Sequence, residues 1–220
     1  MKKPLLSSIS QKFIMALAGI FLMLFLIVHL STNLLMLAGD GGDAFGEAVD
    51  FMTSNPLIKV TEYVLFAAFL IHIIIGFALQ LHNYYSRPVK YRKNIRSDTS
   101  VFSRYMFHTG IIILIFLVIH LLNFFFIRAG LVSVPDYAES AHDFYPMAVQ
   151  LFQNPWYSAI YLVSFVFLGF HLKHAFQSAF QSLGLNHTKY TPAIKLIGLI
   201  YALVISVGFA IIPIYFFFFY

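Results

Sequence analysis

Four histidines lie deep inside long apolar runs, where water cannot satisfy their ring nitrogens. They are His29, His72, His120 and His171, and each lies in a different run. The clearest case is His120, because residues 107–127 around it are almost all Ile, Leu, Val and Phe. Neutral imidazole is the commonest metal ligand in proteins, and it also serves in interhelical hydrogen bonds and proton relays. These four side chains are the first candidates for chemistry in the chain.

The runs that carry these histidines are long enough to cross a bilayer as helices. Of the 220 residues, 60% are hydrophobic and 10% are charged, and the mean hydropathy is +0.81, which excludes an ordinary soluble domain. We therefore expect one all-α integral membrane domain over residues 1–220, with five membrane-spanning helices. The expected spans are residues 13–38, 60–82, 107–127, 156–180 and 194–217.

The segments between the spans differ in charge and predict how the chain crosses the membrane. All but two of the 14 Lys and Arg, Lys59 and Arg128, fall on one side of the expected topology, and all but one of the nine acids fall on the other. Cytoplasmic loops carry the excess of Lys and Arg, so we predict a cytoplasmic N-terminus and an external C-terminus. The net charge of +5 then needs no nucleic-acid partner. On the outer side we expect a Gly-rich acidic loop at 39–57 and a short surface helix within 128–155.

The direction of each span sorts the four histidines into two layers. His29 and His120 fall in the outer halves of outward-running spans, whereas His72 and His171 fall in the inner halves of inward-running spans. At about 1.5 Å of rise per residue, the two layers should lie roughly 10–15 Å apart. Two axial imidazoles from opposite helices at one depth are what a bis-histidine haem requires. We therefore interpret the first four helices as a bundle that binds two haems.

Other readings of the same histidines remain open at this point. Proton-relay residues and interhelical hydrogen bonds are the general alternatives, and a proton-coupled transporter would use intramembrane histidines in that way. A di-metal site would need carboxylates, but the span interiors contain none beyond Glu62 at an edge. The chain has no cysteine, which excludes an iron–sulfur cluster, a c-type haem attachment and a Cys-ligated zinc site.

Several motifs resemble one family of membrane cytochromes. They are Ser8-Ile9-x-x-Lys12-Phe13 before the first span, Phe25-Leu26-Ile27-Val28-His29-Leu30-x-x-Asn33 within it, and a single such histidine in each of the next three spans. Over nearly the whole chain, the sequence resembles the single-subunit, five-span, di-haem cytochrome b anchor of succinate dehydrogenases and fumarate reductases. The branch it resembles most is the one typical of Bacteroidetes-like bacteria.

The resemblance implies a respiratory function in a bacterial cytoplasmic membrane. His29 and His120 would bind the distal b haem, and His72 and His171 the proximal one. An FAD subunit and an iron–sulfur subunit on the cytoplasmic face would exchange electrons through both haems with a quinone, and the resemblance implies menaquinone. The chain would thus be the quinone-reactive subunit and would carry no dicarboxylate site. The resemblance is compatible with either succinate oxidation or fumarate reduction, and with assembly into a higher oligomer. The alternative is the di-haem subunit of another quinone-linked dehydrogenase, such as a hydrogenase or formate dehydrogenase.

Secondary site residues follow from position and charge. The anionic haem propionates would pair with cations on the basic side, and the nearest are Lys12, Arg104, Lys173 and His174. Two acids that precede the second span, Glu47 and Asp50, are candidates for the group that exchanges protons with the quinone.

Four glycines inside the spans could leave room for a flat porphyrin or allow close helix packing. They are Gly19, Gly76, Gly110 and Gly169. Some members of the family have a glutamate two residues before the fourth ligand, which is implicated in transmembrane proton transfer, but this chain has Gly169 there.

Overall fold

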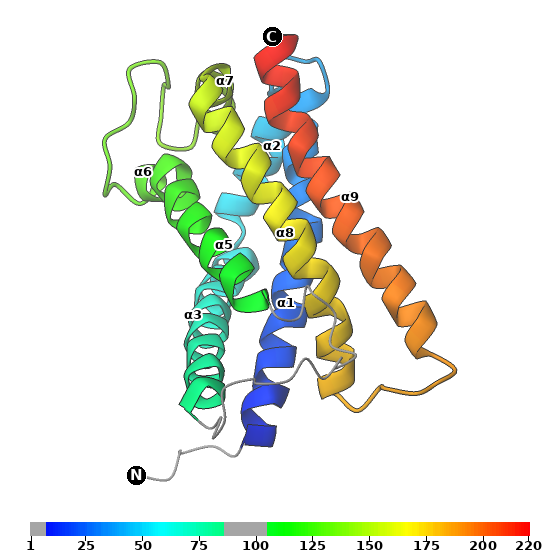
Figure 1. Ribbon diagram of the computed structural model, residues 1–220. Helices are drawn as coiled ribbons and strands as arrows, with labels where there is room; N and C mark the ends of the chain where they lie inside the picture. Colours follow the sequence, from blue (N-terminus) through cyan, green and yellow to red (C-terminus); the bar gives the residue numbers. More distant parts are fainter. Residues whose placement is uncertain (1–7, 86–104) are drawn as a thin grey trace.

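The computed structural model describes residues 8–85 and 105–220, and in this part of the chain helices joined by turns and loops are the secondary structure, without strands. Five helical segments are long and apolar enough to cross a membrane, as the sequence predicts. Figure 1 shows them side by side, with short helices between them. The five segments are α1 (Ser8–Leu34) with the 3₁₀ turn η1 (Leu35–Leu37); α3 (Pro56–Tyr85); α5 (Met106–His120) with the π-helical turn η2 (Leu121–Phe125) and α6 (Phe126–Arg128); α8 (Pro155–Ser182); and α9 (Thr191–Phe218).

Several of these helices extend a few residues beyond the expected spans, because polar caps and prolines start them outside the apolar run. The side-chain oxygen of Asn154 accepts a hydrogen bond from the backbone of Trp156 at 3.0 Å, and Pro155 occupies the first helical position of α8. Asn55 accepts in the same way from the backbone of Leu57 at 2.9 Å, just before α3. Proline at the first helical position lacks an N–H that would be unpaired there in any case.

The first four long helices surround a common interior. The helix α1 packs against α3 and α8, and α8 packs against α5. On the fourth side, side chains of α3 contact those of α5 and η2. The rings of Phe66 and Phe125 lie 4.8 Å apart, and those of Phe77 and Phe107 lie 5.2 Å apart. The order around the bundle is therefore α3, α1, α8, α5. In this order α1 stands opposite α5, and α3 stands opposite α8.

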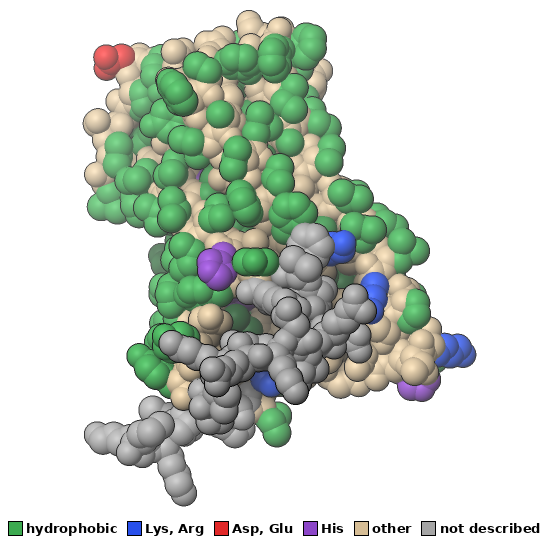
Figure 2. Space-filling model, viewed as in Figure 1, with side chains coloured by type: hydrophobic (Ala, Val, Ile, Leu, Met, Phe, Trp, Pro, Cys, Tyr) green, Lys and Arg blue, Asp and Glu red, His purple; other side chains and the backbone are tan. Residues whose placement is uncertain are grey.

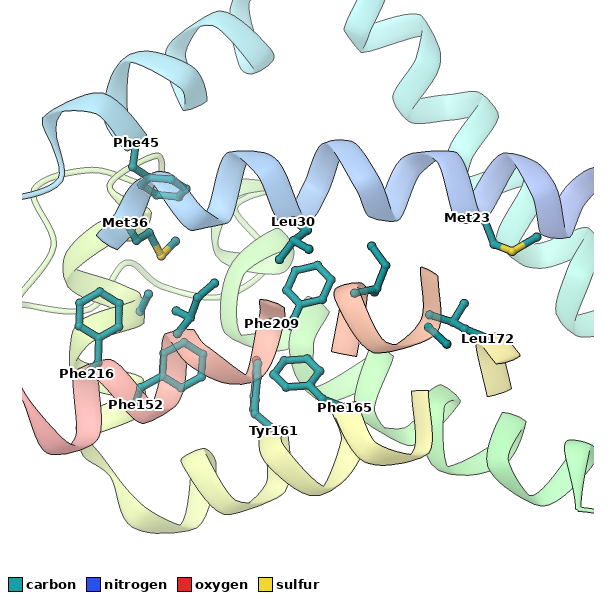
Figure 3. Packing of buried hydrophobic residues seen from close by; sticks show 14 of the residues in the cluster. Met23, Leu30, Met36, Phe45, Phe152, Tyr161, Phe165, Leu172, Phe209 and Phe216 are labelled. Atoms are coloured by element: carbon teal, nitrogen blue, oxygen red, sulfur yellow. The ribbon is translucent and has the colours of Figure 1, made fainter. Parts of the chain in front are cut away.

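The fifth long helix, α9, forms much of the apolar core with α1 and α8. The hydroxyl of Tyr201 donates to the carbonyl oxygen of Met23 at 2.8 Å. Ile205 and Phe216 of α9 are almost completely buried. In the close view of Figure 3, Phe209 and Phe216 lie in one apolar cluster with side chains from α1 and α8. This helix thus supports the four-helix bundle over much of its length.

Two short helices lie at the end of the molecule that holds the C-terminus (Figure 1). The first, α2 (Asp43–Ser54), occupies most of the stretch expected as a loop at 39–57, so that expectation was wrong. Its buried Phe45 and Val49 supply the apolar contacts that a solvated loop would lack. The second, α7 (Phe144–Gln153), is the short helix expected within 128–155, and it buries Met147 and Ala148 while Gln150 and Gln153 are exposed.

The two ends of the molecule differ in charge. We call the end with α2, α7 and the C-terminus the acidic end, and the opposite end the basic end. Figure 2 shows Lys and Arg side chains over the lower part of the molecule and an acidic side chain near the top. The described Lys residues of the basic end are Lys12, Lys173, Lys189 and Lys195. The described acids of the acidic end are Asp40, Asp43, Glu47, Asp50, Glu62, Asp136, Glu139 and Asp143.

Candidate metal centres

The four histidines of the apolar runs face one another in two pairs. The ring centroids of His29 in α1 and His120 in α5 lie 5.7 Å apart, with an angle of 82° between the ring planes. Those of His72 in α3 and His171 in α8 lie 6.3 Å apart, with an angle of 66°. Each pair joins two helices that stand opposite each other in the bundle. The structure therefore brings together the same partners that the depth argument and the family resemblance suggest.

Two glycines show that the pairs lie at different levels. A Cβ at Gly19 in α1 would lie 3.8 Å from Cε1 of His72, and a Cβ at Gly110 in α5 would lie 3.6 Å from Cε1 of His171. His29 and His120 each come ten residues after these glycines in the same helices. At about 1.5 Å of rise per residue, the two pairs are separated by roughly 15 Å along the bundle. The glycines keep both backbones close to the imidazoles of the second pair.

The spacing within each pair fits two imidazoles that bind one metal from opposite sides. An imidazole nitrogen lies about 2 Å from a bound metal, so two such rings in line have centroids on the order of 6 Å apart. Both pairs match this separation. No group of three or more His, Cys, Asp or Glu able to hold a metal ion occurs among the described residues. A two-imidazole donor set suits a metal whose other ligands come from a porphyrin, as in haem.

The Nδ1 atoms of the four rings have unequal partners. Those of His72 and His120 are buried and have no hydrogen-bond partner in the described part of the chain. The Nδ1 atom of His171 lies 3.2 Å from the hydroxyl of Thr109. Asn33 lies 3.4 Å from Nδ1 of His29, but its amide donates at 2.7 Å to the carbonyl oxygen of His29. All four are half-buried as whole residues.

Aromatic side chains line the pair formed by His29 and His120. Phe25 stacks on His29 with a centroid distance of 5.1 Å, and Phe209 of α9 lies 5.6 Å from the same ring. Phe124 lies 5.3 Å from His120. The sequence does not reveal the role of Phe209, because α9 carries no histidine and nothing in its pattern separates one core phenylalanine from another.

A π-helical turn, η2, begins immediately after His120. π-helical turns are rare and often occur at functional sites. Within this turn the amide of Asn123 donates to the hydroxyl of the buried Tyr161 at 3.1 Å. The ring of Tyr161 lies 6.3 Å from that of His120. Asn123 therefore anchors the turn to α8, and the polar tip of Tyr161 is brought close to the histidine pair.

The other predicted site residues lie toward the two ends. Lys12 and Lys173 are exposed at the basic end, while His174 is half-buried one turn after His171. Arg104 lies outside the described residues. Glu47 and Asp50 are exposed on α2 at the acidic end.

The remaining span glycines serve helix packing. At Gly169 of α8, a Cβ would lie 2.8 Å from the hydroxyl oxygen of Ser206 in α9. At Gly76 of α3, a Cβ would lie 3.3 Å from the methyl carbon of Met15 in α1. Position 169 thus faces the α8–α9 contact, where a glutamate side chain would have no room without movement of Ser206.

No family model matches this chain, and no match is found among curated proteins or solved structures.

Proposed function

We propose that this chain is the membrane anchor and electron-transfer subunit of a succinate:quinone oxidoreductase, and that it binds two b haems. The observation that carries the proposal is the pair of facing histidine couples, His29 with His120 and His72 with His171. Their centroid spacing and their two levels fit bis-histidine haem ligation. Among the described residues, no group of three or more His, Cys, Asp or Glu offers a metal site of another kind. The motifs around Lys12 and His29 that resemble the di-haem anchor family specify which kind of cytochrome we propose.

The protein's own residues would do three things for such a centre. The four imidazoles would hold the two haems at levels about 15 Å apart, each bridging two opposite helices. Gly19 and Gly110 would allow close approach of flat groups to the backbones, and Phe25, Phe124 and Phe209 would exclude water from one layer. The haems would supply one-electron transfer along the bundle, from one end toward the other.

The charge difference between the ends supports an orientation and a set of partners. Because Lys and Arg favour the cytoplasmic side, the basic end would face the cytoplasm of a bacterium and the acidic end would face outward. An iron–sulfur subunit, with an FAD subunit attached to it, would then dock at the basic end near the layer of His72 and His171. Lys12, Arg104, Lys173 and His174 are the candidates on this side to bind haem propionates.

The quinone, with menaquinone as the family's expected type, would react near the layer of His29 and His120. Glu47 and Asp50 on α2 are the candidate proton-exchanging groups there. Both side chains are exposed, as a group that exchanges protons with water must be. Glu47→Gln and Asp50→Asn should then slow quinone turnover, while both haems and the reduction of a soluble dye by succinate persist. Normal quinone turnover in both variants would show that neither acid is the proton-exchanging group.

Purification of the tagged chain from native membranes tests the proposal. Pyridine haemochrome analysis should give two b haems per chain, and a flavoprotein and an iron–sulfur protein with succinate dehydrogenase activity should co-purify. One haem or none would overturn the two-layer site. Two haems with hydrogenase or formate dehydrogenase subunits would keep the site and replace the proposed complex by the alternative. A haem-free protein that moves protons would favour a transporter.

A further inference from the structure

Thr109 is a buried polar residue of α5 that contacts one of the candidate ligands. Its side chain is 8% exposed, directly before Gly110. The hydroxyl donates to the carbonyl oxygen of Met106 at 2.9 Å, and the same oxygen lies 3.2 Å from Nδ1 of His171 in α8. The hydroxyl thus links a backbone carbonyl of one helix to a ligand candidate of another.

The two contacts together favour one tautomer of His171. A threonine hydroxyl has a single proton, and a carbonyl oxygen can only accept. The contact with Met106 is the shorter of the two, at 2.9 Å against 3.2 Å. With its proton donated there, the hydroxyl of Thr109 accepts from the ring, and Nδ1 of His171 carries the proton. The other nitrogen, Nε2, is then left with a free lone pair, which is the form that binds a metal.

The other three candidate ligands lack an equivalent contact in the described part of the chain. Nδ1 of His72 and Nδ1 of His120 have no hydrogen-bond partner there. Nδ1 of His29 lies 3.4 Å from the amide nitrogen of Asn33, which also donates to the carbonyl oxygen of His29 at 2.7 Å. An amide nitrogen has two protons and accepts none, so Asn33 Nδ2 is not an acceptor for a ring N–H. In the described part of the chain, the layer of His72 and His171 therefore has a side-chain acceptor at one Nδ1, and the layer of His29 and His120 has none.

We propose that Thr109 is a positioning residue that fixes the tautomer of His171 and thereby tunes the haem of its layer separately from the other haem. This inference rests on the proposed function, because it requires a metal at the pair of His72 and His171. An acceptor at Nδ1 makes an imidazole a stronger electron donor to its metal, which favours the oxidised state. Thr109 would thus lower the midpoint potential of one haem.

Three variants of the purified complex test the role of the hydroxyl. Thr109→Val keeps the size of the side chain and removes the acceptor, while Thr109→Ser restores a hydroxyl. Ser164→Ala is the matched control, because Ser164 is also buried but its hydroxyl bonds only to its own helix, at the carbonyl oxygen of Ile160. The readouts are redox titration of each haem, the low-spin ferric EPR signals, and haem retention.

We expect Thr109→Val to raise the midpoint potential of one haem, to shift only that haem's EPR signal, and to weaken its retention by about 10–100-fold. Thr109→Ser should restore the wild-type values, and Ser164→Ala should match wild type. Wild-type potentials and EPR signals in Thr109→Val would overturn the inference, as would equal defects in Thr109→Val and Thr109→Ser, which would indicate packing alone. Failure of the proposed function is separate, because it would appear as missing haem in the wild-type protein itself.

Discussion

Arg128 at the end of α6 forms an ion pair with Glu62 in α3. Both side chains are largely buried, with 17% and 29% of their surfaces exposed. The guanidinium also lies 5.1 Å from the centre of the ring of Phe125. The pair closes the α3 side of the bundle at the acidic end, where Phe66 and Phe125 are also in contact. The acid inside α3 and the base at the end of α6 are thus each other's partners.

Removal of one partner should destabilise the protein, because the other charge is left poorly solvated. We expect Glu62→Gln to lower the free energy of unfolding by roughly 1–3 kcal/mol. Thermal unfolding in detergent, followed by circular dichroism, measures this change. Glu139→Gln is the control, since Glu139 is exposed on a loop. The double variant Glu62→Gln with Arg128→Gln should recover part of the loss, whereas additive losses would argue against coupling between the two residues.

The facing histidines lead to a pairwise prediction for haem content. His29→Ala and His120→Ala should remove the same component of the reduced-minus-oxidised spectrum, because each haem needs both axial ligands. His72→Ala and His171→Ala should remove the other component. His142→Ala is the control, since His142 is exposed in the loop before α7. His174, one turn after His171 on the same helix, is the competing ligand candidate. If His174→Ala removed a haem while His171→Ala did not, the assignment of the ligand in α8 would be wrong.

The sequence predicts the five long helices well because their signal is simple. A run of about 20 apolar residues is sufficient for a span. Four of the five expected runs fall within the observed segments, and the first, 13–38, ends one residue beyond its segment. The pairing of the histidines could also be predicted from the sequence, because the alternating direction of the spans gives the depth of each histidine in the membrane. The short helix α2 was missed because its glycines and acids suggest a loop, and only its packing through Phe45 and Val49 makes it helical.

The residues around the histidine pairs are harder to predict from the sequence than the pairs themselves. The contact of Thr109 with His171 joins residues that are 62 positions apart, and no local pattern specifies it. The same is true of Asn123 and Tyr161, which are 38 positions apart. Such contacts depend on how each helix is rotated about its axis. The apolar spans have no polar face that would fix this rotation in advance.

Substitution of Gly42 at the acidic end should be poorly tolerated. Its φ of +99° is unfavourable for other residues, and a Cβ would lie 2.5 Å from Cγ of Tyr145 in α7. Gly42→Ala should therefore destabilise the protein by more than the roughly 1–2 kcal/mol expected from the left-handed conformation alone. Gly41→Ala is the matched control, because Gly41 has a φ of +74° and no atom within 4 Å of its Cβ position. Equal unfolding temperatures for the two variants would contradict the contact with Tyr145.

Asp40 makes the start of α2 sensitive to pH. Its carboxylate accepts hydrogen bonds from the backbone N–H groups of Ala44 at 2.9 Å and Gly42 at 3.0 Å. These bonds, that from Ala44 first, hold the pKa of Asp40 below its ordinary value of 3.8. Since the folded pKa lies below the unfolded one, the stabilising contribution is complete well above pH 3.8 and is lost as the pH falls through the folded pKa.

Hydrogen exchange at the first turn of α2 measures this loss locally. After correction for intrinsic exchange rates, protection of the Ala44 amide in the wild-type protein should be constant from neutral pH down to about pH 5, and should decrease below the ordinary carboxyl pKa. Asp40→Asn has one acceptor oxygen and no titrating charge, so its protection should be lower throughout and independent of pH. The amide of Thr53 near the other end of α2 is the internal control in both proteins. Wild-type protection at Ala44 that did not change down to pH 2 would show that the carboxylate does not hold this turn.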